Sequence, residues 1–328
     1  MARTLRIGTR DSQLAVWQAT LVQELLKAQG VDSELVYIKS EGDIDTVTPL
    51  YALGVQGVFT KTLDAALLSG RIDIAVHSMK DVPTQLAQGI VEVAVLERAS
   101  TKDIFVYKEE ADLAKLGWVN GEWSIVNKDS GAALTIDHSP FTIGTSSIRR
   151  IAQWKRRYPN STIENLRGNV NTRLRKVAES NWAGAIFAAA GLERIELRPE
   201  KSVDLDWMLP APAQGAIMIV CRAEDPEAYG LVRPLNHPVT ALCATIERDF
   251  LRTLMGGCST PISALARTEY AQLHFEGNIC SPDGSDLVEI RKTVDLSDAR
   301  DLGVTAGQEL LALPATQKII QEIRNAKA

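Results

Sequence analysis

Strand-like and helix-like stretches alternate through the first hundred residues, and this alternation limits the folds open to the chain. Residues 5–8 have the pattern of a short buried strand, and apolar residues then recur at helical spacing over residues 14–25. Residues 34–38 and 72–76 again have strand patterns, with a helix predicted over residues 58–68 between them. Such alternation is typical of a parallel sheet with helices on both faces. We therefore predict an α/β fold.

The same pattern returns in the middle of the chain. Residues 141–145 repeat the strand and turn of residues 6–9, and in both places a serine-containing cap and a helix with a tryptophan follow. Residues 183–189 then form another buried strand or helix. This echo predicts two similar α/β domains. Residues 109–139 between them are polar and rich in turn residues, which indicates an insertion or a hairpin excursion.

The chain changes character after Pro210 and Pro212. A helix is predicted over residues 241–254, a strand over residues 274–279 and a turn over residues 281–285. A second strand and a closing helix follow. This order of elements predicts a third, small α+β domain.

Composition argues against several classes of protein. The 328 residues carry a net charge of −5, which does not favour nucleic acid or an anionic membrane surface. The first residues run directly into a strand without the apolar segment of a signal peptide, and no apolar run approaches the length of a membrane span. The four cysteines form no CxxC pair and there are only four histidines, so we expect neither a zinc site nor a disulfide framework. A reducing cytoplasm is the expected location.

Positive charge is nevertheless concentrated in one segment, between residues 149 and 175. An acidic protein with such a local concentration is expected to bind a defined anionic ligand. The segment has few aromatic residues beyond Trp154 and Tyr158, which disfavours an RNA-binding protein. The arginines of the segment are Arg149, Arg150, Arg156, Arg157, Arg167, Arg173 and Arg175.

Two of these arginines stand where a helix is expected to begin. In residues 144–150 a strand ends, a threonine or serine offers a cap, and Arg149 and Arg150 fall in the first helical turn. Helix N-termini are partially positive, so each arginine costs about 0.3–1 kcal/mol unless an anion compensates it. An anion site is one interpretation of this pair, and two solvated arginines are the other.

Further arginines follow strand ends or open helices. Arg167 precedes a glycine, and Arg173 follows six residues later near the start of a predicted helix. Arginine suits bidentate recognition of carboxylates better than lysine does. Arg194, and Arg10 with Ser12, are further candidates at strand ends. An ordinary solvated basic face is the alternative interpretation.

A carboxylate lies at a sheet edge where ligand-binding loops are expected. Residues 77–83 follow a predicted strand, and Pro83 holds Val82 extended, which limits the directions in which Asp81 can point. A carboxylate in this place can move a proton or stabilise a developing cation. An aspartate that pairs with the neighbouring Lys80 and faces water explains the same residues equally well.

A short loop over residues 255–261 presents a cysteine. Gly256 and Gly257 free the backbone ahead of Cys258, and Pro261 stiffens the exit. Such a loop can hold a thiol out from the protein body as a nucleophile or as a covalent attachment point. A small buried side chain after a turn is the alternative.

Taken in order along nearly the whole chain, these segments closely resemble the hydroxymethylbilane synthase family, also called porphobilinogen deaminase. Each stretch alone is a weak signal, but the ordered set is highly specific. The matching stretches are residues 6–12, 77–83, 144–150, 166–173, 189–194, 209–216 and 256–258.

The resemblance implies an activity and a cofactor. Such an enzyme is a transferase that joins four porphobilinogen molecules head to tail with loss of ammonia, and then releases the linear tetrapyrrole hydroxymethylbilane. Its primer would be a dipyrromethane cofactor held covalently on the sulfur of Cys258. Each added pyrrole brings two carboxylates, which agrees with many arginines in a protein of negative net charge.

The resemblance also implies roles for individual residues. Asp81 would be the catalytic carboxylate, and Lys80 would assist beside it. The other residues would bind acetate and propionate groups. They are Ser12, Thr145, Ser146, Ser147, Arg149 and Arg150 for the cofactor, and Arg10, Arg149, Arg167, Arg173 and Arg194 for the substrate.

The implied architecture is two periplasmic-binding-protein-like (type II) domains with mixed sheets and a small C-terminal α+β domain. Residues 1–107 with about 215–235 would form domain 1, residues 108–210 domain 2 and residues 238–328 domain 3. The family suggests a monomer, with no metal, nucleic acid or membrane partner. A non-enzymatic binding protein with the same cleft is the main alternative, and the lack of a signal peptide counts against it.

Two segments depart from the family pattern. Where the family often has lysine within a Gly-Lys-Gly stretch, this chain has Val55, Gln56 and Gly57, so one expected positive charge near the site is in doubt. The segment of residues 109–139 is longer than the usual link, and its sequence indicates no function.

Overall fold

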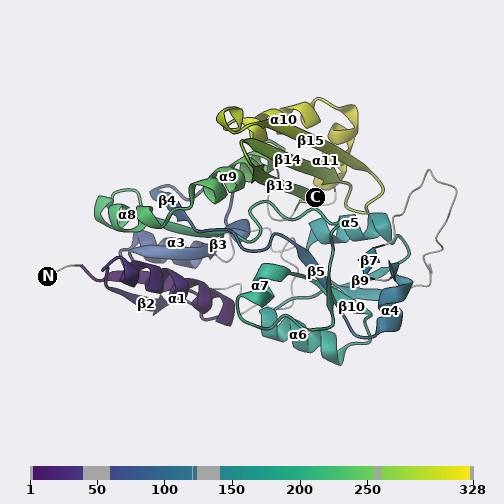
Figure 1. Ribbon diagram of the computed structural model, residues 1–328, viewed down its shortest axis with the longest axis horizontal. Coiled ribbons are helices and arrows are strands. Elements are labelled where there is room, and N and C mark those ends of the chain that lie inside the picture. Colours follow the sequence, from purple (N-terminus) through teal and green to yellow (C-terminus); the bar gives the residue numbers. More distant parts are fainter. Residues whose placement is uncertain are drawn as a thin grey trace.

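The computed structural model describes residues 3–39, 60–119, 121–123, 141–254, 256 and 260–325. Two five-stranded sheets lie side by side, and a smaller unit with a three-stranded sheet lies against both of them (Figure 1). We call these the first unit, the second unit and the C-terminal unit.

The first sheet has the strand order β2-β1-β3-β12-β4. Its strands are β1 (Leu5–Thr9), β2 (Ser33–Tyr37), β3 (Ile74–Ser78), β4 (Ile90–Val95) and β12 (Ile217–Arg222). Strands β2, β1 and β3 are parallel, but β12 runs antiparallel between β3 and β4. The alternation alone predicted a parallel sheet, and the insertion of this distant strand makes it a mixed sheet, as the family resemblance implied. Helices α1 (Gln13–Ala28), α3 (Lys61–Leu68) and α8 (Pro226–Val232) pack on it.

The second sheet repeats this arrangement, with the order β9-β8-β10-β5-β11. Its strands are β5 (Asp103–Tyr107), β8 (Thr142–Gly144), β9 (Thr162–Glu164), β10 (Gly184–Ala188) and β11 (Ser202–Asp204). Strands β9, β8 and β10 are parallel, and β5 is antiparallel to both of its neighbours. Its helices are α5 (Ile148–Arg157), α6 (Val170–Glu179) and α7 (Ala189–Glu193).

The shared strand order is that of two type II periplasmic-binding-protein-like units. In each sheet the fourth strand is antiparallel, and the chain reaches it by crossing from the other unit. Strand β5 follows directly from the first sheet, and β12 follows from the second. Two crossing segments, residues 96–102 and 205–216, therefore join the units.

The C-terminal unit packs one helix and two shorter ones on an antiparallel sheet. Helix α9 (Pro238–Thr253) leads into it, and the sheet has the order β13-β14-β15. The predicted strand over residues 274–279 lies within β14, but β13 was not predicted, and two helices rather than one close the chain. These elements are β13 (Ile262–Glu269), β14 (Gln272–Cys280), β15 (Leu287–Asp295), α10 (Leu302–Leu311) and α11 (Pro314–Asn325).

The polar segment between the first two units begins as a small excursion. It forms α4 (Glu110–Lys115) and a two-stranded hairpin of β6 (Trp118–Val119) and β7 (Glu122–Trp123). The indole of Trp123 donates a hydrogen bond of 2.6 Å to the carbonyl of Asp204, which ties the hairpin to the second sheet. Residues 124–140 of the predicted insertion lie outside the described residues.

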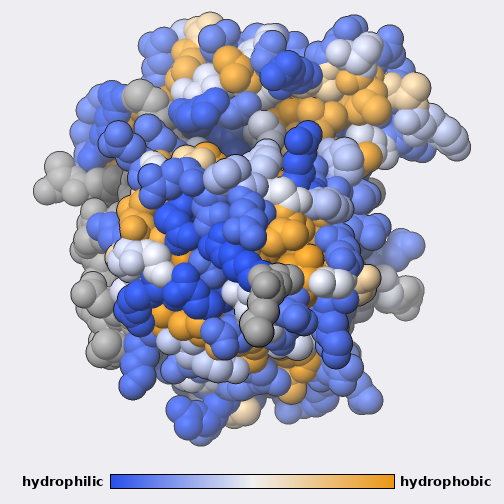
Figure 2. Space-filling model, turned by 90° about the vertical axis from the view of Figure 1, so that its left-hand side faces the viewer, coloured by the Kyte–Doolittle hydropathy of each residue, from blue (hydrophilic) through white to orange (hydrophobic). Residues whose placement is uncertain are grey.

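Apolar side chains fill both faces of the two larger sheets. One pair of clusters, with Leu5 and Ile72 at their centres, covers the first sheet, and a second pair, with Phe105 and Ile104, covers the second. A fifth cluster around Phe250 and Phe275 fills the C-terminal unit. On the face drawn in Figure 2, polar side chains predominate and the apolar ones lie in separate small patches. The sheets are thus rigid supports for the loops at their edges.

Candidate functional site

The predicted catalytic loop is a single tight turn at the end of a buried strand. Strand β3 ends at Ser78, and residues 79–81 form a 3-10 turn, η1 (Met79–Asp81). The fully buried Met79 anchors the turn, and its N–H donates to the carbonyl of Ala216 at 3.0 Å. This anchoring leaves Asp81 exposed and turns Lys80 partly inward.

Arg248 on α9 holds this turn through hydrogen bonds to its backbone carbonyls. Arg248 Nη1 donates to the carbonyls of Met79 at 3.2 Å and Val82 at 2.9 Å, and Nη2 donates to that of Pro83 at 2.7 Å. The Arg248 side chain is buried. Because α9 is the helix that leads toward Cys258, the turn that bears Asp81 is attached to the same helix.

Lys80 lies in an environment that disfavours its charge. Its Nζ donates to Gln214 Oε1 at 3.2 Å. Burial lowers the pKa of Lys80 to about 8, with the charges of Arg150 and Arg149 acting in the same direction and those of Asp81 and Asp103 opposing it.

The two arginines at the start of α5 share a buried carboxylate. Arg149 Nη2 donates to Asp103 Oδ2 at 2.6 Å, and Arg150 donates to Oδ1 from Nη2 at 2.7 Å and from Nε at 3.1 Å. Burial by itself would raise the pKa of the Asp103 carboxyl, but the two arginines outweigh it and hold that pKa well below its usual range. The interpretation of two solvated arginines is therefore wrong, because both are buried. The compensating anion that the helix start requires is, in part, Asp103.

Arg149 retains unused hydrogen-bonding capacity. Burial lowers the pKa of its guanidinium, and Nε has no hydrogen-bond partner among the described residues. A buried donor without an acceptor is costly, by about 1–3 kcal/mol, unless a ligand supplies the acceptor.

The polar residues before α5 shape its N-terminus. Ser147 is the N-cap residue, but its side chain makes no capping hydrogen bond. Thr145 is buried, and the Ser146 hydroxyl donates to Asn165 Oδ1 at 2.5 Å. The first turn of α5 therefore keeps backbone N–H groups for which the cap side chain offers no acceptor.

More arginines approach this group from the loop before α6. Arg173 Nε donates to the carbonyl of Gly168 at 2.7 Å. Burial, together with the charges of Arg150, Arg167 and Arg10, lowers the pKa of Arg173 to about 10, and the charge of Asp81 opposes this shift. Arg10, Arg150, Arg167 and Asp81 are therefore all within electrostatic range of Arg173.

Arg194 contacts the crossing segment of residues 205–216 and helix α1. Its Nη2 donates to the carbonyl of Gly215 at 2.6 Å, and its guanidinium lies 5.8 Å from the ring centroid of Trp17 on α1. Burial lowers the pKa of Arg194 to about 10. Ser12 caps α1 without a side-chain hydrogen bond. These contacts connect Arg194 to the crossing segment and to α1.

Cys258 and Gln56 lie outside the described residues, so the structure describes neither the loop of the predicted attachment point nor the departure from the lysine pattern. The other three cysteines are buried thiols, and burial raises the pKa of Cys221 and Cys243 to about 11 and that of Cys280 to about 12. None of these three thiols is activated as a nucleophile.

Sequence reasoning missed Asp103, Gln214 and Arg248 as members of the site. A signal for Asp103 was present, because two arginines in the first turn of a helix require an anion, but nothing local indicated which acidic residue supplies it. Gln214 falls in the segment of residues 209–216 that carried the resemblance, and no role was assigned to it.

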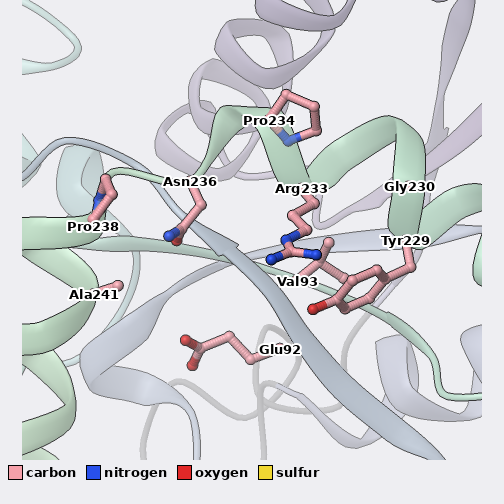
Figure 3. A pocket seen from close by; sticks show the side chains of 9 residues that line it. All are labelled: Glu92, Val93, Tyr229, Gly230, Arg233, Pro234, Asn236, Pro238 and Ala241. Atoms are coloured by element: carbon pink, nitrogen blue, oxygen red, sulfur yellow. The ribbon is translucent and has the colours of Figure 1, made fainter.

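Two cavities lie outside this cleft. One, of about 630 Å³, is formed around Glu92, Tyr229, Arg233 and Asn236, whose side chains approach one another in Figure 3. The other, of about 620 Å³, lies between the second and C-terminal units beside Trp207 and Asn278. Neither contains a predicted site residue. Within the described ranges no group of three or more metal-binding side chains occurs, and none of the helices there is long and apolar enough to cross a membrane.

Comparison with known proteins gives two family matches. Residues 5–229 match the family model "Porphobilinogen deaminase, dipyromethane cofactor binding domain", and residues 241–312 match "Porphobilinogen deaminase, C-terminal domain". The chloroplastic porphobilinogen deaminase of Oryza sativa subsp. japonica is 40% identical over 319 residues, which cover 94% of this chain and 83% of that protein.

Solved structures of binding proteins are also similar to this chain. The methionine binding protein MetQ has a TM-score of 0.42 and 15% identity, covering 71% of this chain and 89% of its own. A periplasmic binding protein of Salmonella typhimurium with high arginine specificity has a TM-score of 0.38 and 12% identity, covering 73% of this chain and 94% of its own.

Proposed function

Because this chain belongs to the porphobilinogen deaminase family, we propose that the cleft around Asp81, Lys80 and the Asp103 arginines is its active site. The chain is a hydroxymethylbilane synthase, a transferase of tetrapyrrole biosynthesis with a dipyrromethane cofactor. It condenses four porphobilinogen molecules head to tail with loss of ammonia, and then releases the linear tetrapyrrole by hydrolysis. The assignment of residues to these steps is the proposal.

The observation that carries the proposal is a shortage of carboxylates in the cleft. Among the described residues, Arg149 and Arg150 form ion pairs with one buried carboxylate, Asp103, and the charges of the exposed Asp81 and of Asp103 act on Lys80. The lowered pKa values of Lys80, Arg149 and Arg173 all express this excess of positive charge together with burial. A ligand with several carboxylates would relieve the excess, and acetate and propionate groups on pyrroles are such a ligand.

The residues also fit the bound cofactor. Arg149 Nε has no acceptor among the described residues, and the N-cap Ser147 side chain makes no capping hydrogen bond, at a helix start where an anion is favoured. We assign Ser12, Thr145, Ser146, Ser147, Arg149 and Arg150 to the cofactor. We assign Arg10, Arg149, Arg167, Arg173 and Arg194 to the substrate. When bound as a thioether on Cys258, the dipyrromethane supplies the pyrrole end to which the first porphobilinogen is joined.

We assign to Asp81 the electrostatic stabilisation of the positive charge that forms during the reaction. Loss of ammonia from the aminomethyl group of porphobilinogen leaves positive charge on the pyrrole, and a fixed carboxylate stabilises it. The turn that bears Asp81 is fixed by Met79 and by Arg248, so the carboxylate needs little reorganisation. Asp81 can then hold the proton that the coupled pyrrole loses. Lys80 in its charged form binds a carboxylate of the substrate beside this turn.

The cofactor assignment is tested by the intact mass of the denatured protein. We expect the wild-type mass to exceed the sequence mass by one dipyrromethane adduct, and Cys258→Ser to lack the adduct. Cys243→Ser is the matched control, because it removes a buried thiol from α9 and should keep the adduct. An unmodified wild-type mass in protein that consumes porphobilinogen would rule out the covalent cofactor on Cys258.

The role of Asp81 is tested by Asp81→Ala. Because the side chain is exposed, the fold should persist, while porphobilinogen consumption falls by about 10²–10⁴-fold. Asp112→Ala on α4 is the control with unchanged turnover. Circular dichroism and turnover are measured on the same samples, and turnover within threefold of wild type would remove Asp81 from the mechanism.

We also propose the domain limits, location and oligomeric state that the sequence suggested. The sequence suggested residues 1–107 with about 215–235, residues 108–210 and residues 238–328, and we keep these domains with one change. Strand β5 pairs within the second sheet, so we move the first limit from residue 107 to about residue 102. The three buried free cysteines support a reducing compartment, for which we propose the cytoplasm. Light scattering tests the proposed monomer.

A further inference from the structure

Gln214 joins the two walls of the cleft. Its side chain is 1% exposed and lies in the crossing segment between the two larger units. Oε1 accepts from Lys80 Nζ at 3.2 Å, on the loop of the first sheet. Nε2 donates to Asp103 Oδ1 at 3.0 Å, at the start of β5 in the second sheet, and to the carbonyl of Thr101 at 2.7 Å, just before that strand.

The orientation of this amide is fixed by chemistry. A lysine ammonium can only donate, and an ionised carboxylate can only accept. The oxygen of Gln214 must therefore face Lys80, and the nitrogen must face Asp103. In the reversed amide, the nitrogen donor would face the Lys80 ammonium and the oxygen acceptor would face the Asp103 carboxylate. This glutamine therefore has one stable orientation.

The backbone on both sides of Gln214 is held as well. Ala213 has a left-handed φ of 59°, and its N–H donates to the buried Glu247 Oε2 at 2.6 Å. Gly215 has a φ of 87°, and a Cβ there would lie 2.6 Å from the carbonyl oxygen of Ser100. Arg98 Nε donates to the Gln214 carbonyl at 2.8 Å. These contacts fix the backbone position from which the Gln214 side chain extends.

A neutral amide has a specific advantage at this position. A carboxylate in its place would neutralise Lys80 within the protein and would repel Asp103. A glutamine satisfies one N–H of Lys80 and one lone pair of Asp103 and leaves the net charge of the cluster unchanged. Gln214 therefore adds no negative charge of its own beside Lys80 and Asp103.

We propose that Gln214 is a positioning residue, which holds Lys80 of the first unit against Asp103 of the second and leaves the charge of Lys80 to the substrate. The inference rests on the proposed function, because it assumes that Lys80 meets substrate. Gln214 itself touches no reacting atom in this account. It keeps the two walls of the cleft at one separation through its two opposed hydrogen bonds.

The test measures the titration of Lys80 directly in the cofactor-loaded enzyme. Lysines are labelled by reductive ¹³C-methylation, and the Lys80 resonance is assigned by its loss in Lys80→Met. Gln214→Leu removes an acceptor from the ammonium and should move the titration of Lys80 downward by about one pH unit. Gln214→Glu places a negative charge there and should move it upward by about one pH unit. The charged groups that act on Lys80 in both variants are the same: Asp81, Asp103, Arg149 and Arg150.

The kinetic consequences of the two variants also differ. Gln214→Leu releases Lys80 from its place, and we expect kcat to fall by about tenfold. Gln214→Glu keeps Lys80 in place but cancels charge, and we expect KM for porphobilinogen to rise by about tenfold with a smaller change in kcat.

Gln153→Leu is the matched control. Gln153 is another buried glutamine near the crossing segment, and it bonds the backbone of Leu209 and the hydroxyl of Ser263. Its loss should lower stability without moving the Lys80 titration. Opposite shifts in the two Gln214 variants support the inference, whereas no shift, or shifts of one sign, overturn it. If Lys80→Met turns over porphobilinogen normally, the proposed role of Lys80 fails, while the resonance shifts still decide the role of Gln214.

Discussion

Two ion clusters in the described part of the chain each surround a buried aspartate. In one of them the numbers of positive and negative side chains are equal, and in the other they are not. The Asp73 cluster lies near the N-terminus, where Asp73 accepts from Arg3 at 2.6 Å and from Arg6 at 2.8 Å. Hydrogen bonds raise the pKa of both arginines, that of Arg3 chiefly through Asp225 and that of Arg6 through Asp73. The cluster has three arginines and three carboxylates, namely Arg3, Arg6, Arg222, Asp73, Asp225 and Glu227.

The Asp103 cluster, in the cleft, has the same kinds of group in another ratio. Among the described residues it consists of Asp103 with Lys80, Arg149, Arg150 and Gln214, which is one buried carboxylate for three cations, and the exposed Asp81 acts on Lys80 beside it. Here burial lowers the pKa of Arg149 and of Lys80, the opposite direction from Arg3 and Arg6. A balanced cluster has no need of a ligand, whereas an unbalanced one gains stability from an anion. The ratio of charges, more than the number of arginines, therefore distinguishes a structural cluster from a binding site.

The largest expected difference between the two clusters is the loss of stability when the central aspartate of each is neutralised. Asp103→Asn leaves two buried arginines without a carboxylate, and we expect a loss of about 3–5 kcal/mol in the free energy of unfolding. Asp73→Asn should cost less, because Arg3 keeps its bonds to Asp225 and Glu227. Urea unfolding followed by tryptophan fluorescence measures both losses. Equal losses would contradict the distinction.

Much of the fold was predictable because its periodicity is local. The strand and helix patterns of residues 5–28 and 141–157 identified two α/β units correctly. The insertion of β12 into the first sheet was not predictable from periodicity, since an apolar run such as Ile217–Val220 fits any buried strand position. Its pairing is set by the crossing of the chain, which no local pattern records.

The site shows the same limit. Arg149 and Arg150 were identified because a helix start disfavours cations, which is a local rule. Their partner Asp103 is 46 residues earlier in the chain and is one of 41 acidic residues. The role of Gln214 depends on Lys80, which is 134 residues away. Residues that act through distant partners can be assigned only when the chain is folded.

Acid tests the comparison, because we expect both ion clusters to stay intact at pH values where another group, His77, already lowers the stability of the protein. Arginines hold the pKa of Asp73 and of Asp103 well below the usual range, so both ion clusters should persist down to the ordinary range of carboxyl groups. Burial lowers the pKa of His77 to about 4. The unfolded chain binds a proton near pH 6.5, so this contribution to stability is complete above pH 6.5 and is lost as pH falls to about 4.

We therefore expect the free energy of unfolding to fall by at most about 3 kcal/mol over that window, through His77. His77→Gln should remove most of the decline, and urea midpoints at pH 7, 6, 5 and 4.5 measure it. If stability declines by the same amount in His77→Gln, then groups other than His77, such as those of the ion clusters, cause the acid sensitivity.

The smallest expected effects come from removing one arginine of each cluster. Arg149→Met takes a cation from the unbalanced cluster, and Asp103 keeps its bonds to Arg150 and Gln214, so stability should change little. Elongation should slow by about tenfold, because a carboxylate of the growing chain loses a charge-assisted donor. Arg222→Met takes a cation from the balanced cluster and also leaves the carbonyls of Leu67 and Ile72 without its guanidinium.

Arg222→Met should therefore lower stability by about 1–3 kcal/mol and leave elongation unchanged. Intact masses after timed exposure to porphobilinogen count the pyrroles added, and urea midpoints give the stability. Both side chains are mostly buried, and each bonds carboxylates and backbone carbonyls. The charge ratio of the clusters predicts the difference in elongation, and the two carbonyls to which Arg222 donates predict the difference in stability. If both variants lose stability and elongate normally, the cleft arginines are structural, and the excess charge in the Asp103 cluster has another purpose.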